Sequence, residues 1–121
     1  MSFERMAPEQ HDTLEGIAEP SETARLVGHR EAGATVASAY RAGRLPHALL
    51  LTGPQGIGKA TFAFHVAHHL LTHRDPQSAP PQLTVPDPAS AQFRQVASGA
   101  HLGVLHLTRA YNEKTKKFGT A

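Results

Sequence analysis

Residues 49–61 read Leu49-Leu50-Leu51-Thr52-Gly53-Pro54-Gln55-Gly56-Ile57-Gly58-Lys59-Ala60-Thr61. In this stretch an apolar run with the length of a β-strand leads into a glycine-rich loop, and a lysine and a helical pattern follow. The order matches the phosphate-binding loop GxxxxGK[ST], except that the last position is alanine. We therefore expect a buried strand joined to a helix by a loop that is shaped for an anion.

Such a loop binds phosphate mainly through its backbone. Gly53, Gly56 and Gly58 carry no side chains that would keep the N–H groups away from a ligand. The helix that begins near Lys59 adds unpaired N–H groups and a positive dipole end, and Lys59 itself supplies a point charge for the outer phosphates. A working loop uses the next hydroxyl to bind Mg²⁺, but Ala60 has none, and Thr61 is turned by about 100° around the helix. ATP or ADP binding is accordingly expected to be weak, and Mg²⁺ binding is doubtful.

The chain on either side of the loop alternates between helical and strand-like patterns. Apolar spacing predicts a helix over about residues 30–42, ended by Gly43, and a second helix over about 59–72. A short helix is expected over 92–98. The continuously apolar runs 48–52 and 102–108 are typical of buried parallel strands. The expected fold class is α/β, with parallel strands flanked by helices as in the N-terminal part of a P-loop nucleotide-binding domain.

The helix after the loop carries three histidines. His65 and His69 stand one turn apart, and His68 lies beside them. The segment lacks the glutamate of an HExxH motif and any carboxylate that would complete a metal site. We interpret these histidines as the polar face of an amphipathic helix whose apolar stripe faces a core, and we assign no metal ligand.

Composition restricts the class of protein. The 121 residues contain twelve Lys and Arg against ten Asp and Glu, a net charge of +2 that is too small to argue for a nucleic-acid surface by itself. The absence of cysteine excludes disulfides and thiolate metal sites. No apolar run approaches the length of a membrane span, and the acidic N-terminus does not resemble a signal peptide. We expect a cytoplasmic protein.

Three segments are expected to stand apart from the folded part. Residues 1–24 are polar and acidic and predict a mobile leader that precedes a domain over 25–121. Residues 75–91 are rich in proline and predict an insertion loop within that domain. The basic residues between 109 and 117 are interpreted as a solvated loop.

A family resemblance covers most of the chain beyond the leader. It rests on Val27-Gly28-His29, on Gly43-Arg44-Leu45-Pro46-His47-Ala48 with the loop through Ala60, and on Gly99-Ala100-His101 with Asn112-Glu113-Lys114-Thr115-Lys116. These residues resemble bacterial clamp-loader subunits of the AAA+ class, and within that class most closely the delta-prime family of DNA polymerase III. Many relatives carry a cysteine-rich zinc module where this chain has its proline-rich segment.

The resemblance implies a function in DNA replication. It predicts a noncatalytic stator of the assembly that opens a sliding clamp and closes it around primed DNA, with the other clamp-loader subunits as partners. It places Val27, Gly28 and His29 near an adenine, and it places Gly56, Ile57, Gly58, Lys59, Ala60 and Thr61, together with Gly53 of the motif, around the phosphates. It also implies an N-terminal fragment truncated before the Walker B strand, and no residue is assigned as catalytic. The alternative is an active AAA+ ATPase, such as a hydrolysing sister subunit, in which Thr61 or water replaces the missing metal ligand.

Overall fold

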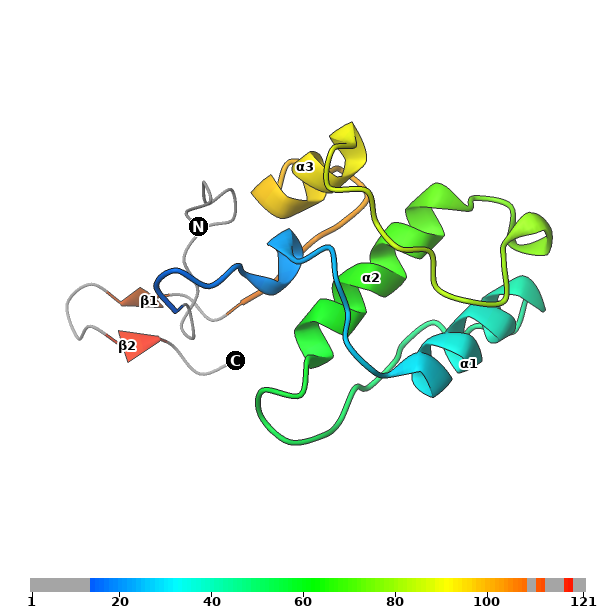
Figure 1. Ribbon diagram of the computed structural model, residues 1–121, viewed down its shortest axis with the longest axis horizontal. Helices are drawn as coiled ribbons and strands as arrows, with labels where there is room; N and C mark the ends of the chain where they lie inside the picture. Colours follow the sequence, from blue (N-terminus) through cyan, green and yellow to red (C-terminus); the bar gives the residue numbers. More distant parts are fainter. Residues whose placement is uncertain (1–13, 109–110, 113–116, 119–121) are drawn as a thin grey trace.

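The computed structural model describes residues 14–108, 111–112 and 117–118. Within them the chain forms the α-helices α1 (Arg30–Arg41), α2 (Lys59–Thr72) and α3 (Ala91–Ser98), and the 3-10 helices η1 (Pro20–Glu22) and η2 (Pro76–Ser78). The two-residue strands β1 (Tyr111–Asn112) and β2 (Lys117–Phe118) pair antiparallel. Helix α2 lies at the centre, with α1 on one side and η1 and α3 on the other (Figure 1).

The predicted helices are confirmed, and their ends have identifiable causes. After α1, Gly43 adopts a left-handed conformation with φ 71°. The N–H groups of Gly43 and Arg44 then bond the carbonyls of Tyr40 and Ala39, which is the Schellman arrangement. Ser90 is the N-cap of α3, and its hydroxyl accepts a hydrogen bond from the Phe93 N–H at 3.1 Å.

The hydrophobic core surrounds α2. Its apolar members are mostly aromatic and small aliphatic side chains from α1, α2, α3 and the segment between α2 and α3: Ala37, Phe62, Phe64, Val66, Ala79, Phe93, Val96 and Ala97. Phe93 of α3 is only 2 % exposed and stacks on the His68 ring of α2, with ring centroids 5.4 Å apart. Phe93 therefore anchors α3 to α2.

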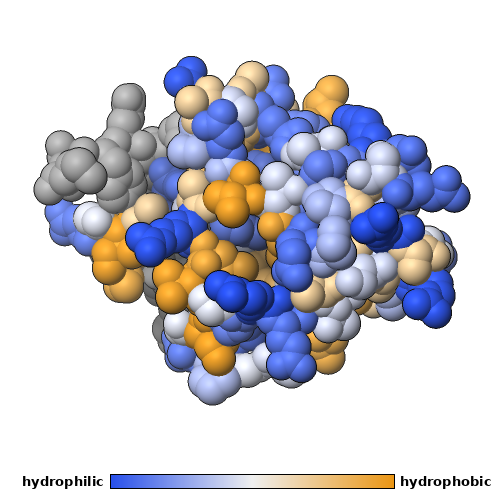
Figure 2. All heavy atoms as spheres, turned by 45° about the vertical axis from the view of Figure 1, so that its right-hand side comes forward, coloured by the Kyte–Doolittle hydropathy of each residue, from blue (hydrophilic) through white to orange (hydrophobic). Residues whose placement is uncertain are grey.

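The predicted α/β class is wrong for the described residues, which form a helical fold without any parallel sheet. Residues 48–52 and 102–108 were expected to be strands, but both segments lack regular structure. Leu50 is 88 % exposed and Leu105 is 82 % exposed, so these leucines lie on the surface. Figure 2 shows that one face of the molecule carries apolar areas among polar side chains. A strand needs a neighbour for its N–H and C=O groups, and an apolar composition cannot supply one.

The proline-rich segment after α2 lies against the helices. Leu83 packs onto α1 so closely that a Cβ at Gly33 would stand 3.2 Å from Leu83 Cδ1. On the other side of Leu83, the Thr84 N–H donates to His69 Nδ1 of α2 at 3.1 Å. Residues 79–86 thus cover the junction between α1 and α2.

Part of the acidic leader is also packed. Glu19 and Ser21 are buried, and η1 contacts both α2 and α3. Residues 1–13 of the leader, and most of the basic segment 109–117, lie outside the described residues. No helix in the described part is long and apolar enough to cross a membrane.

Candidate functional site: a glycine loop at the start of α2

The loop between residues 53 and 58 has the backbone conformation that its glycines permit. Gly53, Gly56 and Gly58 have φ of 151°, 83° and 99°, a region that side chains with a Cβ disfavour. Gly58 is the N-cap of α2, and no side chain caps the helix there. The first N–H groups of α2 have no partner within the helix, and no acidic side chain of its own first turn neutralises the positive end of the helix dipole.

Lys59 closes the loop. Its Nζ donates to the carbonyl oxygens of Gly53 at 2.6 Å and Pro54 at 3.0 Å. The Ile57 N–H donates to the Pro54 oxygen at 3.4 Å and completes a turn. The ammonium group of Lys59 therefore binds both carbonyl oxygens at the start of the loop and compensates their partial negative charge.

His29 holds the other end of the loop. Its Nε2 lies 2.6 Å from the Ile57 carbonyl oxygen, and the ring packs edge-on against Phe62 with centroids 6.3 Å apart. His29 has φ 56° and occupies the N-cap of α1, so this contact connects the start of α1 to the start of α2. The three loop carbonyls at Gly53, Pro54 and Ile57 all meet protein donors, whereas no side chain among the described residues caps the N–H groups at the start of α2. This distribution favours an anion.

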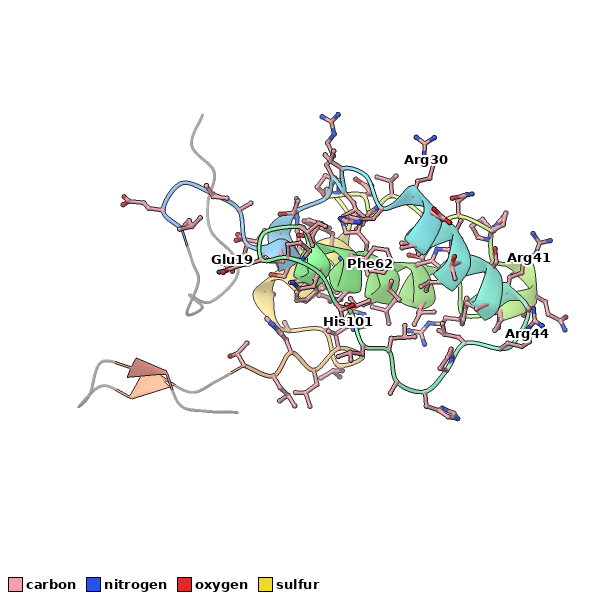
Figure 3. The ribbon with its side chains drawn as sticks, turned by 90° about the horizontal axis from the view of Figure 1, so that it is seen from below. Glu19, Arg30, Arg41, Arg44, Phe62 and His101 are labelled. Carbon is pink, nitrogen blue, oxygen red and sulfur yellow. The ribbon has the colours of Figure 1, made fainter. Side chains whose placement is uncertain are left out.

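The loop borders an open pocket of about 640 Å³. One wall consists of loop and α2 residues that include Lys59, Ala60 and Thr61, and the other consists of residues 14–20. That second wall includes the buried Glu19, which lies close to the start of α2 with Phe62 (Figure 3).

The metal-binding part of the motif is incomplete. Ala60 is the second residue of α2 and is exposed, so a methyl group stands where the motif has a hydroxyl. Thr61, the third residue, is half-buried and lines the same pocket. The residues present fit a phosphate through amides and Lys59, and they offer Mg²⁺ no side-chain ligand at the motif position.

The three residues expected near an adenine, Val27, Gly28 and His29, do not line one common pocket. Gly28 and His29 line a second pocket of about 570 Å³ together with Gly33, His65 and residues 82–88. Val27 lines neither of these two pockets and is 78 % exposed. The structure therefore brings His29 to the glycine loop but does not bring Val27 there.

The prediction of a solvated histidine face on α2 is wrong. His65, His68 and His69 are all buried, and His69 has no exposed surface at all. Other segments pack against α2 on several sides. Polar side chains on this helix are therefore buried against protein, whereas on a helix at the edge of the fold they would be exposed to water. His65 bonds the Thr23 carbonyl through Nε2, while the Nε2 atoms of His68 and His69 have no hydrogen-bond partner within the described part of the chain.

Burial changes the acid–base properties of two of these histidines. Desolvation lowers the pKa of His68, and His65 and His101 lower it further. Desolvation also lowers the pKa of His69, with a contribution from His73. Among the described residues, no three His, Cys, Asp or Glu side chains converge on a metal-sized site.

Sequence reasoning missed three structural features of this region: the His29–Ile57 contact, the burial of Glu19, and the hydrogen bond from Thr84 to His69. Each joins residues that are distant in the chain. Only Gly28 gave a local signal of the turn before α1, because a glycine permits the positive φ that both Gly28 and His29 adopt there.

Comparison with known protein families gives a match that covers most of the chain. The family described as DNA polymerase III, delta subunit, matches residues 28–118, a range that includes the glycine loop and all three α-helices. Comparison with curated proteins and with solved structures gives no significant match.

Proposed function

Because the chain belongs to the family described as DNA polymerase III, delta subunit, we propose that it is a delta-prime-like stator of the clamp loader. Family membership ties the chain to a clamp-loader-related role in DNA replication. The finer proposal is that the chain holds partner subunits in place within the cytoplasmic assembly and does not itself hydrolyse ATP. Its partners are the other clamp-loader subunits, and it meets the sliding clamp and primed DNA through the assembly.

The observation that carries this proposal is the pairing of an ordered loop with Ala60. Lys59 and His29 hold the loop carbonyls, and among the described residues no side chain caps the start of α2, which supports the proposal of an anion-binding loop. Nucleotide hydrolysis also needs Mg²⁺ to bridge the outer phosphates, and the motif's hydroxyl ligand is missing. A loop of this kind supports weak, Mg²⁺-indifferent binding of ATP or ADP and not turnover.

The test is assembly and turnover measured on the same protein. The chain is mixed with the remaining clamp-loader subunits, complexes are isolated by gel filtration, and ATP hydrolysis is followed with the chain alone and in the complex. We expect stable co-elution, no turnover by the chain alone, and unchanged turnover of the complex in Lys59→Met. Turnover by the chain alone that Lys59→Met abolishes would establish the alternative, an active AAA+ ATPase. Failure to co-elute would contradict the stator role.

The missing hydroxyl can be restored directly. In Ala60→Ser we expect Mg²⁺ to strengthen ATP binding, because a serine at this position returns the motif's metal ligand. Ala63→Ser is the matched control, since Ala63 lies three residues further along α2 and is exposed outside the pocket. An equal response of the two variants would show that the loop does not present phosphate to position 60.

A further inference from the structure

One contact at the loop joins segments that are far apart in the sequence. His29 Nε2 lies 2.6 Å from the Ile57 carbonyl oxygen, across a separation of 28 residues. A carbonyl oxygen accepts hydrogen bonds and cannot donate them, so Nε2 must carry the hydrogen. The contact therefore selects the Nε2–H form of a neutral His29 ring.

The contact fixes the orientation of a whole peptide group and not only that of the Ile57 carbonyl. The Ile57 C=O and the Gly58 N–H belong to the same planar trans peptide, in which the two groups point in opposite directions. Holding the Ile57 oxygen toward His29 therefore turns the Gly58 N–H away from His29. Gly58 is the N-cap of α2, so this peptide is the last unit of the loop before the helix dipole begins.

Without His29 the peptide has an alternative. Gly58 is free of side-chain restrictions, and a flip of the Ile57–Gly58 peptide would direct the carbonyl toward the place where the N–H now points. A carbonyl there would repel an anion. The hydrogen bond from His29 holds this peptide in its observed orientation.

His29 is itself well anchored for this purpose. Its backbone lies in the left-handed region at the N-cap of α1, and its ring packs edge-on against Phe62 of α2. A Cβ at Gly58 would lie 3.7 Å from His29 Nε2, which confirms that the ring reaches the helix start without crowding it.

We propose that His29 is a positioning residue that sets the orientation of the Ile57–Gly58 peptide and thereby the anion affinity of the loop. The anion-binding half of this statement rests on the proposed function, whereas the positioning half concerns the protein without ligand. The ligand class is a polyphosphate, which meets the loop through backbone N–H groups and Lys59.

The test compares His29→Gln with His29→Leu in the full chain. Both variants place a residue with a Cβ at the same left-handed backbone position, so they share its strain, but only glutamine keeps an N–H donor near the place of Nε2. Inorganic triphosphate is the probe, titrated by calorimetry. We expect His29→Leu to bind about tenfold more weakly, since one hydrogen bond of about 1.4 kcal/mol corresponds to that factor, and His29→Gln to recover most of the loss. His47→Leu, a change at an exposed histidine, controls for the loss of an imidazole.

A second readout needs no ligand. Nitrogen-15 spectra of the wild type should show the Nε2–H tautomer of His29, and the Gly58 amide resonance should shift in His29→Leu and return in His29→Gln. Equal affinity and equal Gly58 shifts in the two variants would overturn the proposal. If the wild type binds no triphosphate while Gly58 still follows the donor at position 29, the positioning role stands and nucleotide binding is refuted.

Discussion

Replacing Lys59 with methionine separates the two tasks of this side chain. Lys59 Nζ donates to the Gly53 and Pro54 carbonyls at 2.6 and 3.0 Å, and both contacts are exposed to solvent. Methionine keeps most of the alkyl stem and removes only the charge and the donors. Water can solvate both carbonyls after the substitution, so the loss in the free energy of unfolding should be small.

The magnitudes follow from the environment of each interaction. An exposed hydrogen bond contributes about 0.5–1.5 kcal/mol, and two that share one donor group on a solvated loop should together contribute about 1 kcal/mol. Hydrogen bonds from a charged donor to a phosphate contribute about 1.5–3 kcal/mol, which corresponds to roughly 10- to 150-fold in affinity. Lys59→Met should therefore lose little stability and most of its affinity for triphosphate.

The assays are urea unfolding followed by circular dichroism and calorimetric titration with triphosphate. Arg94→Met is the control, because it removes one exposed positive charge from α3, away from the loop. Unchanged affinity in Lys59→Met, or an equal loss in Arg94→Met, would refute the assignment of Lys59 to the anion site. A loss of more than about 3 kcal/mol in stability would show that Lys59 mainly holds the fold.

Three further predictions concern the loop, the core and the buried histidines. Gly58→Ala should cost about 1–2 kcal/mol in urea unfolding, because the φ of 99° strains any residue with a Cβ even though its nearest neighbour, His29 Nε2, would lie at an ordinary 3.7 Å, and an unchanged midpoint would mean that the loop has another conformation. Phe93→Ala should cost about 3–5 kcal/mol, because its ring is 2 % exposed and joins α3 to α2, whereas a loss below 1 kcal/mol would contradict this packing. Acid should destabilise the protein, because burial lowers the pKa of His68 and His69 below the ordinary 6.5. The stability that depends on their neutral forms is complete above pH 6.5 and is lost as the pH falls from 6.5 through the lowered pKa values of the folded state. Urea midpoints measured from pH 7.5 to 5 test this, and midpoints that rise toward pH 5 would contradict it.

The sequence alone determined the local structure. Helices α1, α2 and α3 follow from apolar spacing, and Gly43, Ser90 and Gly99 mark their ends through their own conformational and hydrogen-bonding properties. The glycine loop and the position of Lys59 are equally local, because positive φ and a helix start depend on a few adjacent residues. These predictions required no knowledge of the tertiary contacts between the helices.

The tertiary structure decided everything that depends on a distant partner. The runs 48–52 and 102–108 have the composition of buried strands, but a strand exists only when another backbone pairs with it, and among the described residues none does. His65, His68 and His69 were assigned to water from their polarity, but η1, α1, α3 and residues 79–86 cover α2 and bury them. The His29 contact with Ile57 is of the same kind, since no local pattern brings two residues 28 positions apart within hydrogen-bond distance. Backbone conformation is set by neighbours in the chain, whereas burial and long-range hydrogen bonds are set by neighbours in space.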